Sequence, residues 1–555
     1  MSPAASSPHF DGARPRLVAT RPIVGQRAGT SGLRKKTAIF ASSGYLENFV
    51  QSALDVLPKV AGATVVMGGD GRHGNARAID VILRMLAAAG VSRVLVGESG
   101  ILSTPAASAL IRARRADFGI ILSASHNPGG PDGDFGIKIN GANGAPASES
   151  LTDEIYGRTR TIDRYLTLDG PRIDIGRLGT RRMGATDVEI VDPVADYAAL
   201  MQRLFDFDRI RDHFRAGFRM RFDAMNAVNG PYATTILETM LGASVGTVLN
   251  GKPLEDFGGA HPDPNPVHAA ALIRSLRGPD APDLGAATDG DGDRHLIVSR
   301  GGPVTPSDSI AVLAANAALV PSYKGRVSGL ARSMPTSRAL DRVAADLGVS
   351  LYETPTGWKF FGNLLDSGKI VLCGEESAGA GSDHLREKDG LWAVLFWLDI
   401  LAARRESAQD LLAAHWRRFG RDYCRRLDYE GIPEDRARDM IENLRRKVGA
   451  LVGTRTQAGN VVKADDYRYV DPVDGSISDR QGLRVELEGG ARIVYRLSGT
   501  GTEGATLRVY VERFEPPQGR HDLDATDALA DTIAAAKALA EIELRTGRNA
   551  PDVIQ

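Results

Sequence analysis

The sequence predicts an α/β protein with three similar mixed or parallel α/β sandwich domains and a smaller α+β domain at the C-terminus. Three observations support this class. The 555 residues exceed one ordinary hydrophobic core and suggest three to five domains. Strand-like apolar runs alternate with helical periodicity through the first three quarters of the chain. Each round of this alternation ends in a short polar motif that contains glycine.

The first round lies in residues 1–200, which we assign to domain I. Its predicted elements are strands at 64–67, 93–96 and 118–122 and helices at 76–89 and 105–114. The order β-α-β-α-β implies a parallel sheet with helices on its faces. The last strand runs into the polar motif SASHNPGG at 123–130.

The next two rounds lie in residues 201–312 and 313–418, assigned to domains II and III. Their motifs are DGDGDR at 289–294 and GEES at 374–377. The predicted strands are 220–223, 244–249, 285–288, 326–331, 350–353 and 370–373, and the helices are 230–241, 267–276 and 336–347. Because parallel sheets bind ligands beyond the carboxyl ends of their strands, we expect these motifs to line a central cleft.

Residues 419–555 differ in pattern and are assigned to domain IV. The predicted elements are strands at 484–487, 493–497 and 506–512 and helices at 433–448 and 525–546. The loop 498–505 carries the fourth polar motif.

The composition excludes several classes of protein. The 68 basic and 69 acidic side chains give a net charge of −1, so no overall field attracts nucleic acid or an anionic membrane. Two cysteines rule out a disulfide framework and favour a reducing compartment. The longest apolar run, at 391–403, is too short to span a bilayer and contains Asp399. We therefore expect a cytoplasmic protein.

The DGDGDR motif has the composition of a metal site. Asp289, Asp291 and Asp293 supply three hard oxygen ligands of the kind that Mg²⁺ prefers, and the glycines between them let the backbone curl. An EF-hand is excluded because arginines occupy its sixth and twelfth positions. The alternative is a solvated acidic turn.

Ser125 is a candidate acceptor of a phosphoryl group. It is not in a Gly-x-Ser-x-Gly context, so a hydrolase nucleophile is not indicated. Lys138 and the predicted metal would supply the positive charge that phosphoryl transfer needs. Taken alone, the motif around Ser125 is more often an ordinary turn.

The fourth motif has the composition of a phosphate-binding loop. Small and hydroxyl-bearing residues at 498–504 lie between Arg496 and Arg508. The loop also matches Gly-x-Gly-x-x-Gly, but a strand follows it, which argues against a dinucleotide site. A second decoy at 246–252 lacks the Ser or Thr of a nucleotide-binding P-loop, because Pro253 stands there.

Each of the other polar residues has both a functional and a structural interpretation. Glu375 and Ser377 suit hydrogen bonds to sugar hydroxyls, or they cap the next element. His384 and Lys388 lie in a polar run that also suits a solvated loop. Arg34 is either a ligand of phosphate or an ordinary surface arginine.

Six stretches occur in one order along the chain. They are GTSGLRKK at 29–36, SASHNPGGPDGDFGIKIN at 123–140, DGDGDR at 289–294, PTGWKFFGNLLD at 355–366, GEESAGAGSDHLREKDGLWAVL at 374–395 and RLSGTGTEGATLRVY at 496–510. Together they resemble the α-D-phosphohexomutase superfamily, and most closely its phosphoglucomutase branch. Ala378 departs from the family pattern, which usually has Phe there, and this puts sugar selectivity in question.

The resemblance implies a role for each matched residue. The implied catalytic residues are Ser125, His126, Lys138 and Arg294, and the implied Mg²⁺ ligands are Ser125, Asp289, Asp291 and Asp293. The implied substrate-binding residues are Arg34, Thr356, Gly357, Glu375, Ser377, His384, Lys388, Arg496, Ser498, Gly499, Thr500 and Arg508. The identity of the general base stays open.

The resemblance also implies the reaction, which is the interconversion of α-D-glucose 1-phosphate and glucose 6-phosphate through a phosphoserine. Glucose 1,6-bisphosphate would be the intermediate and activator. We expect small-molecule sugar phosphates as partners, no nucleic acid or membrane, and a monomer or weak dimer. The alternatives are a phosphomannomutase or bifunctional hexose mutase, a non-catalytic scaffold, and a nucleotide-dependent kinase.

Overall fold

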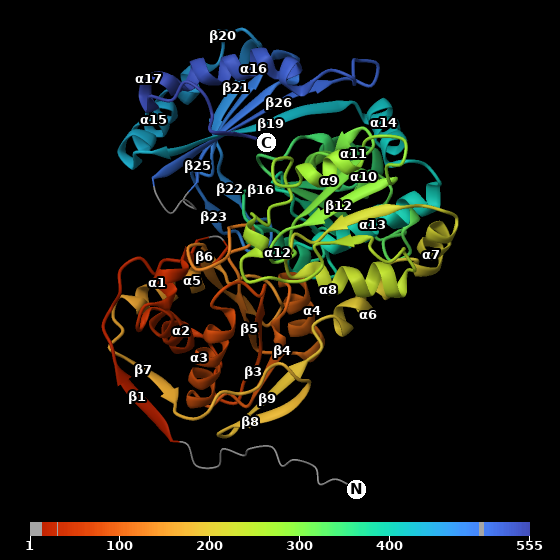
Figure 1. The fold of residues 1–555 in the computed structure, drawn as a ribbon. Helices are drawn as coiled ribbons and strands as arrows, with labels where there is room; N and C mark the ends of the chain where they lie inside the picture. Colours follow the sequence, from red (N-terminus) through yellow and green to blue (C-terminus); the bar gives the residue numbers. More distant parts are fainter. Residues whose placement is uncertain (1–13, 30, 499–503) are drawn as a thin grey trace. The chain divides into compact units, whose positions relative to one another are not determined.

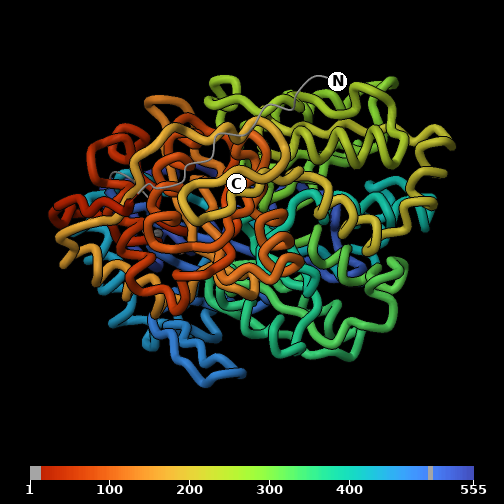
Figure 2. The backbone as a smooth tube through the Cα atoms, turned by 90° about the horizontal axis from the view of Figure 1, so that it is seen from below, coloured from red at the N-terminus to blue at the C-terminus, as the bar shows by residue number. Residues whose placement is uncertain are grey.

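The computed structural model describes residues 14–29, 31–498 and 504–555. Its described residues form two compact units, which we treat separately (Figure 1). Unit 1 is drawn from Met1–Pro303, Leu319–Lys324 and Gly379–Arg404. Unit 2 is drawn from Val304–Ala318, Gly325–Ala378 and Arg405–Gln555. The backbone of both units can be followed in Figure 2.

The first sheet of unit 1 has the strand order β2-β6-β5-β3-β4-β9-β8. Strand β3 pairs in parallel with β4 and β5, β4 pairs in parallel with β9, and antiparallel strands close both edges. The strands are β2 (Leu33–Lys36), β3 (Thr64–Gly69), β4 (Arg93–Ile101), β5 (Phe118–Leu122), β6 (Asp134–Gly141), β8 (Gly179–Met183) and β9 (Thr186–Val191). A separate antiparallel pair joins β1 (Pro15–Ala19) to β7 (Arg164–Leu168).

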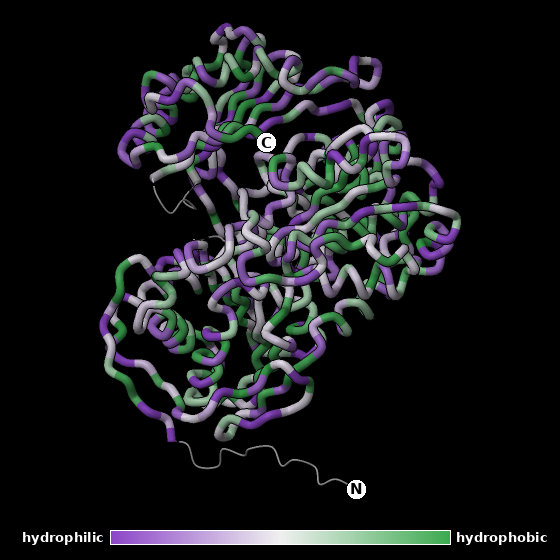
Figure 3. The backbone as a smooth tube through the Cα atoms, viewed as in Figure 1, coloured by the Kyte–Doolittle hydropathy of each residue, from purple (hydrophilic) through white to green (hydrophobic). Residues whose placement is uncertain are grey.

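Helices cover both faces of this sheet because its central strands are apolar on both sides. Val65 and Met67 belong to a core shared with α2 and α3, whereas Val66 is buried outside that core. Figure 3 colours these strands as hydrophobic. The helices are α1 (Thr37–Ala41), α2 (Tyr45–Val56), α3 (Asn75–Ala88), α4 (Thr104–Arg114), α5 (Glu149–Thr159) and α6 (Ala195–Leu204).

The second sheet of unit 1 has the order β11-β10-β12-β13-β14. Strand β10 pairs in parallel with β12, and β12 forms an antiparallel hairpin with β13 around residues 289–294. The elements are β10 (Met220–Asp223), β11 (Val248–Leu249), β12 (Leu284–Thr288), β13 (His295–Ser299), β14 (Gly302–Pro303), α7 (Phe207–Arg215), α8 (Asn229–Ala233) and α9 (Ala270–Ser275). The helix predicted at 230–241 is α8 followed by a π-helical stretch, Thr234–Met240.

The apolar run at 391–403 forms helix α13 (Gly390–Arg404), which packs against β12, β13 and α7. It is buried from Gly390 to Ala402, and strand β18 (Ala380–Ser382) precedes it. Asp399 is also buried and accepts a hydrogen bond from Arg209 Nη2 at 2.7 Å. The helix is therefore part of a protein core. Among the residues that the structure describes, no helix has the length and hydropathy needed to cross a bilayer.

Unit 2 contains a parallel sheet and a large antiparallel one. In the first, β15 (Gly329–Ser333) pairs in parallel with β16 (Ser350–Thr354) and β17 (Leu372–Gly374). Its helices are α10 (Pro306–Ala315), α11 (Ala339–Leu347), α12 (Lys359–Asp366) and α14 (Ala408–Phe419).

The antiparallel sheet has the order β20-β21-β24-β25-β26-β19-β27. Its strands are β19 (Arg421–Ile432), β20 (Arg455–Thr456), β21 (Gly459–Asp466), β24 (Leu483–Leu487), β25 (Arg492–Ser498), β26 (Ala505–Glu515) and β27 (Val553–Ile554). A small hairpin joins β22 (Tyr469–Val470) to β23 (Ile477–Ser478). The helices are α15 (Glu434–Lys447), α16 (Ala525–Ala540) and α17 (Ile542–Thr546).

The predicted fold class is confirmed: the sheets of unit 1 and the β15–β17 sheet are α/β, and the C-terminal part is α+β. The helix predicted at 525–546 is interrupted at Glu541, which has a φ of 52°. The boundaries of four domains stay a prediction. Each compact unit contains more than one sheet, and residues 379–404 belong to unit 1 although the predicted domain III included them.

Candidate active site

Ser125 and Asp289 meet in unit 1. Ser125 lies just after β5, Asp289 lies just after β12, and both are buried. The Ser125 Oγ donates a hydrogen bond to Asp289 Oδ2 at 2.8 Å. Ser125 has a φ of 54°, a left-handed conformation that is uncommon for residues with a side chain. Such a backbone persists only where its surroundings hold it, and it is frequent at functional sites.

A buried arginine holds the Ser125 loop in this conformation. Arg72 Nη2 donates to the carbonyl oxygen of Ser125 at 2.7 Å, and Nη1 donates to that of Asp134 at 2.8 Å. Its Nε donates to Asp70 Oδ2 at 2.9 Å. Ser123 Oγ accepts from the Ser125 backbone N–H at 2.7 Å and donates to Asp70 at 2.6 Å. Arg72 is not among the predicted site residues; the signal in the sequence was the charged pair Asp70 and Arg72, which comes shortly after the predicted strand at 64–67.

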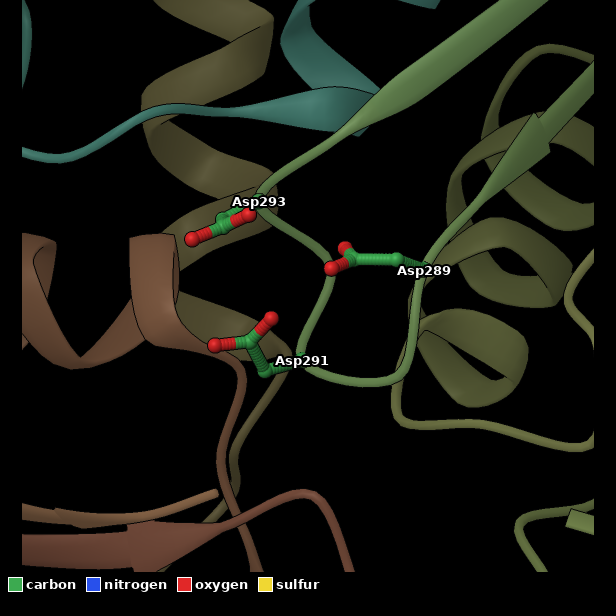
Figure 4. A group of neighbouring side chains, drawn as sticks. All are labelled: Asp289, Asp291 and Asp293. Carbon is green, nitrogen blue, oxygen red and sulfur yellow. The ribbon is translucent and has the colours of Figure 1, made fainter. Parts of the chain in front are cut away.

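The three aspartates of the predicted metal motif lie close together on the loop between β12 and β13 (Figure 4). Each offers one carboxylate oxygen within 4.8 Å of the others, and all three residues are buried. The glycines make this possible. A Cβ on Gly290 would lie 2.4 Å from the Ser125 carbonyl oxygen, and Gly292 has a φ of 79°.

The donor set fits a hard cation. Within the described part of the chain, Asp291 Oδ1 and Asp293 Oδ1 are buried without a hydrogen-bond partner. Buried carboxylate oxygens normally have partners, and a divalent cation is one that this loop suits. The buried, Ser125-linked position is also unlike the solvated turn that the sequence left open.

Two lysines neutralise part of the carboxylate charge. Lys138 Nζ, from β6, lies 2.5 Å from Asp291 Oδ2, and Thr104 Oγ1 donates to the same oxygen at 2.7 Å. Lys388 Nζ lies 3.1 Å from Asp293 Oδ2. The two lysines thus lie in the same cluster as the acidic loop, to which Ser125 is linked through Asp289.

The pKa values of the aspartates diverge. Burial raises the pKa of Asp289 well above its usual value, and the negative charges of Asp291 and Asp293 add to this effect. Burial also acts to raise the pKa of Asp291, but the Lys138 ammonium and the Thr104 hydroxyl outweigh it and hold that pKa well below the usual value. The protein's own groups therefore favour the ionised form of Asp291 more than that of Asp289.

Two of the predicted arginines border the same cluster. The Arg294 backbone N–H donates to Asp289 Oδ1 at 3.0 Å, and its Nε lies 4.0 Å from Asp289 Oδ2 and Asp293 Oδ1. Arg34, on β2, lies opposite Gly136 of β6. Burial lowers the pKa of Arg34, while the carboxylates of Asp291 and Asp293 oppose that shift. His126 follows Ser125 directly in the chain.

His384 lies in a buried hydrogen-bond chain. Its Nδ1 lies 2.6 Å from Ser382 Oγ and its Nε2 lies 3.1 Å from Asp389 Oδ2. Tyr197 donates to Asp389 Oδ1 at 2.6 Å, and the Ser382 hydroxyl also contacts that of Tyr323 at 2.7 Å. The histidine side chain is only 1% exposed. A direct contact of His384 with substrate stays a prediction. Its burial favours an indirect role, in which His384 contacts Asp389, the residue that follows Lys388 in the chain.

Glu387 is a further buried acid that the sequence analysis did not single out. Its Oε1 accepts a hydrogen bond from Asn140 Nδ2 at 2.8 Å. Burial raises the pKa of Glu387 to about 7, although the Lys138 charge acts to lower it. The sequence signal was weak because Glu387 lies in a polar run that suits a solvated loop.

The predicted sugar-binding residues lie in unit 2. Glu375 follows β17, and its Oε1 accepts from the Gly357 backbone N–H at 2.9 Å. The Thr356 Oγ1 is buried and has no hydrogen-bond partner among the described residues. Ser377 lies two residues after Glu375, in the segment that follows β17. Glu375 is thus held beside the 356–357 turn, with a hydroxyl available there.

The predicted phosphate-binding residues also lie in unit 2. Arg496 of β25 and Arg508 of β26 are directly opposite each other in the antiparallel ladder. Ser498 is the last residue of β25. Gly499 and Thr500, which we also predicted to bind substrate, lie outside the described residues.

Four family models match the chain in succession. They describe the α/β/α domains I, II and III of phosphoglucomutase/phosphomannomutase, over residues 25–166, 195–302 and 306–419, and the C-terminal domain of phosphoglucomutase-1, over residues 421–552. Together they match most of the chain.

Relatives with curated names agree with these models. A phosphoglucomutase of Rhizobium radiobacter is 55% identical, over 97% of this chain and 99% of that protein. Human phosphoglucomutase-1 is 48% identical, over 97% and 99%. Two Arabidopsis thaliana relatives, one named chloroplastic and one named probable cytoplasmic, are 48% and 47% identical; the first covers 96% of this chain and 88% of that protein, the second 97% and 99%.

A solved structure agrees as well. The open form of pp63/parafusin, a phosphoglucomutase from Paramecium, has a TM-score of 0.90 and 47% identity, and the match covers 98% of this chain and 99% of that one. The chain therefore belongs to the phosphoglucomutases, a branch of the α-D-phosphohexomutase superfamily and enzymes of the isomerase class that transfer a phosphoryl group within a sugar phosphate.

Proposed function

We propose that this chain interconverts α-D-glucose 1-phosphate and glucose 6-phosphate, with Ser125 as the carrier of the phosphoryl group. The observation that supports this most directly is the 2.8 Å contact of the Ser125 hydroxyl with Asp289, inside a cluster of three carboxylates and two lysines. A hydroxyl next to a cation site and fixed positive charges suits phosphoryl transfer, which depends on positioning and charge neutralisation.

In this proposal Ser125, Asp289, Asp291 and Asp293 hold Mg²⁺. The cation, when bound, would neutralise charge on the phosphoryl group of Ser125. Lys138 and Lys388 lie where their ammonium groups contact the loop carboxylates, so they also face that charge. Arg34, Arg294 and His126 complete the polar surroundings of the serine.

Each turnover has two half-reactions. Phosphorylated Ser125 gives its phosphoryl group to the free end of a glucose monophosphate, which forms glucose 1,6-bisphosphate. After the bisphosphate reorients, its other phosphate returns to the Ser125 Oγ and leaves the isomeric monophosphate. A trace of added bisphosphate would restore any dephosphorylated enzyme, which is why we expect it to act as an activator.

The residues of unit 2 bind the rest of the substrate in this proposal. Glu375, Ser377, Thr356 and Gly357 provide acceptors and donors for sugar hydroxyls. The non-reacting phosphate binds Arg496 and Arg508 together with the 498–500 segment. Guanidinium groups recognise the phosphate itself, so one site accepts the 1-phosphate and the 6-phosphate in turn.

We further propose a cytoplasmic monomer or weak dimer that acts only on small-molecule sugar phosphates. Relatives named chloroplastic and cytoplasmic both exist, so the location needs its own measurement. Cell fractionation tests the location, and light scattering across a range of concentrations tests the oligomeric state.

The test of the function is a coupled assay of glucose 6-phosphate formation, with Mg²⁺ and a trace of glucose 1,6-bisphosphate. We expect activity in the wild type and almost none in Ser125→Ala, because this change removes the hydroxyl that contacts Asp289 and that would carry the phosphoryl group. Ser123→Thr is the matched control: it keeps the neighbouring buried hydroxyl and should retain activity. Comparable turnover in Ser125→Ala would end the serine-carrier proposal.

A second candidate activity is the mutase reaction of mannose 1-phosphate, because the matching family models also cover phosphomannomutases and Ala378 departs from the pattern beside Ser377. The same assay with mannose 1-phosphate separates the two. We expect a higher kcat/KM for glucose 1-phosphate.

A further inference from the structure

The sheet that carries Arg496 and Arg508 has two chemically different faces. Side chains such as Leu507, Val509 and Ile493 belong to the core that includes residues of α15 and α16. The alternate residues of β19, β25 and β26 project to the other face, because successive residues of a strand point to opposite sides. That second face is rich in charge, and its three strands are adjacent (Figure 1).

The strand register arranges this charged face in rows. One row of this face consists of Arg496, Arg508 and Asp428, which are paired across β25, β26 and β19. The next row consists of Val494, Tyr510 and Arg426 in the same strand order. Tyr510 and Arg426 therefore lie on the same face as the two predicted phosphate ligands, one row further from the loop.

Asp428 links the two rows. Arg426 Nε lies 3.0 Å from Asp428 Oδ1, and Arg426 Nη2 lies 3.0 Å from Asp428 Oδ2. Arg508 Nε lies 3.8 Å from the same Oδ2 and, among the described residues, has no hydrogen-bond partner. One carboxylate thus faces two guanidinium groups, and Arg496 lies opposite Arg508. The face keeps an excess of positive charge.

The hydroxyl of Tyr510 is buried on this face. The residue is 5% exposed, and its ring packs in a cluster with Met334, Tyr467, Tyr469 and Val494. Its oxygen has no hydrogen-bond partner among the residues that the structure describes. Buried hydroxyls normally have one, because burial removes their hydrogen bonds to water.

The charges that act on this hydroxyl identify its surroundings. Burial raises the pKa of Tyr510, and the Glu376 carboxylate adds to that effect. The guanidinium groups of Arg496, Arg508 and Arg426 oppose it. The neutral Tyr510 hydroxyl is thus a fixed hydrogen-bond donor, and the charges of three arginines and of Glu376 act on it.

We propose that Tyr510 and Arg426 extend the phosphate subsite of Arg496 and Arg508, and that the Tyr510 hydroxyl donates a hydrogen bond to the non-reacting phosphate of the bound hexose phosphate. Arg426 supplies charge and holds Asp428, which in turn orients Arg508. This assignment rests on the proposed function, because it takes the anion to be the phosphate of the substrate. The competing assignment is a hydrogen bond from Tyr510 to Glu376, which would order the sugar-binding segment.

The experiment compares Tyr510→Phe with Tyr429→Phe. Tyr429 is an equally buried tyrosine of the same sheet whose hydroxyl also has no partner among the described residues, but it belongs to the core on the opposite face. Each change removes one oxygen. Calorimetric titration with glucose 6-phosphate, in a Ser125→Ala background, reports binding without turnover. Glucose without phosphate is the second titrant.

We expect Tyr510→Phe to weaken glucose 6-phosphate binding about tenfold, as for loss of a hydrogen bond to a charged group, with glucose binding and the melting temperature unchanged. Tyr429→Phe should change none of these. In the Ser125-containing enzyme, the same tenfold change should appear in KM and not in kcat.

Equal affinities for glucose 6-phosphate in the two variants would overturn the proposal. Parallel loss of glucose binding would also overturn it, in favour of the Glu376 assignment. Absence of turnover by the wild type, with the binding difference retained, would instead refute the proposed reaction alone.

Discussion

The cluster around Ser125 in unit 1 and the arginine face in unit 2 satisfy their polar groups differently. In unit 1, the Ser125 hydroxyl donates to Asp289, and Lys138 and Lys388 contact the neighbouring carboxylates. In unit 2, Arg508 Nε and the Tyr510 hydroxyl have no hydrogen-bond partner among the described residues. The unit 1 cluster holds Ser125 with the protein's own charges and, among the described residues, leaves acceptor oxygens of Asp291 and Asp293 without partners, whereas the unit 2 face keeps donors available.

This difference suits two tasks in the proposed reaction. Charges fixed before the substrate arrives stabilise a phosphoryl group in transfer without reorganisation. A site that must hold the phosphate of two isomeric substrates in turn benefits from donors that are not committed to protein acceptors.

Replacement of Lys138 by Met tests whether the Ser125 cluster depends on internal charge balance. Asp291 is fully buried, and the loss of its cationic partner should lower the free energy of unfolding by about 3–5 kcal/mol in EDTA. Mg²⁺ at the same loop should restore most of this loss. Urea unfolding with EDTA and with Mg²⁺ measures both values.

The control is Lys59→Met, which removes a surface pair with Asp117 and should cost about 1 kcal/mol or less in either condition. An equally large loss for Lys138→Met with and without Mg²⁺ would show that the three aspartates do not bind the cation.

His415 tests whether unit 2 also contains, away from its arginine face, a buried titratable group whose charge no nearby acid offsets. Burial lowers the pKa of His415 from 6.5 to about 4, and the positive charges of Arg342 and Arg418 act in the same direction. Between these values the unfolded chain binds more protons than the folded one, so stability falls as the pH falls. The full shift in the pKa of His415 corresponds to about 3 kcal/mol in the free energy of unfolding.

His415→Leu should remove this part of the pH dependence. The measurement is the melting temperature of both proteins from pH 7 to pH 4, where the wild type should lose stability relative to the variant. Parallel curves for the two proteins would contradict the assignment.

Gly290→Ala tests the close approach of the serine and metal loops. The new Cβ would lie 2.4 Å from the Ser125 carbonyl oxygen, so one of the two loops must move. A displacement of about 1 Å at a catalytic centre costs about a hundredfold in rate, which corresponds to about 2.7 kcal/mol. We expect that loss in kcat, measured by the coupled assay.

Gly157→Ala is the matched control, because Gly157 lies inside α5 and an added Cβ would meet nothing within 4 Å. It should leave kcat unchanged. Full activity in Gly290→Ala would mean that the contact of the two loops is not needed for transfer.

Local pattern predicted many elements closely. The strand predicted at 118–122 is β5 with the same bounds, and the strand predicted at 285–288 is β12 with one further residue. Strand β6 was not predicted, because residues 123–140 were read as one motif and its pairing partners β2 and β5 lie elsewhere in the sequence. The strand predicted at 244–249 is shorter in the structure, where only β11 forms. Pairing at the edge of the sheet, and not β-propensity, sets its length.

The order of the residues alone sets which chemical groups this protein has and where its polar motifs fall relative to predicted strands. Only the tertiary structure decided which groups face each other: Lys138 contacts Asp291, 153 residues away, and Arg72 holds the Ser125 loop. The physical reason is that periodicity and turn residues act over a few positions, whereas a buried ion pair depends on sheet order and on how two sheets pack.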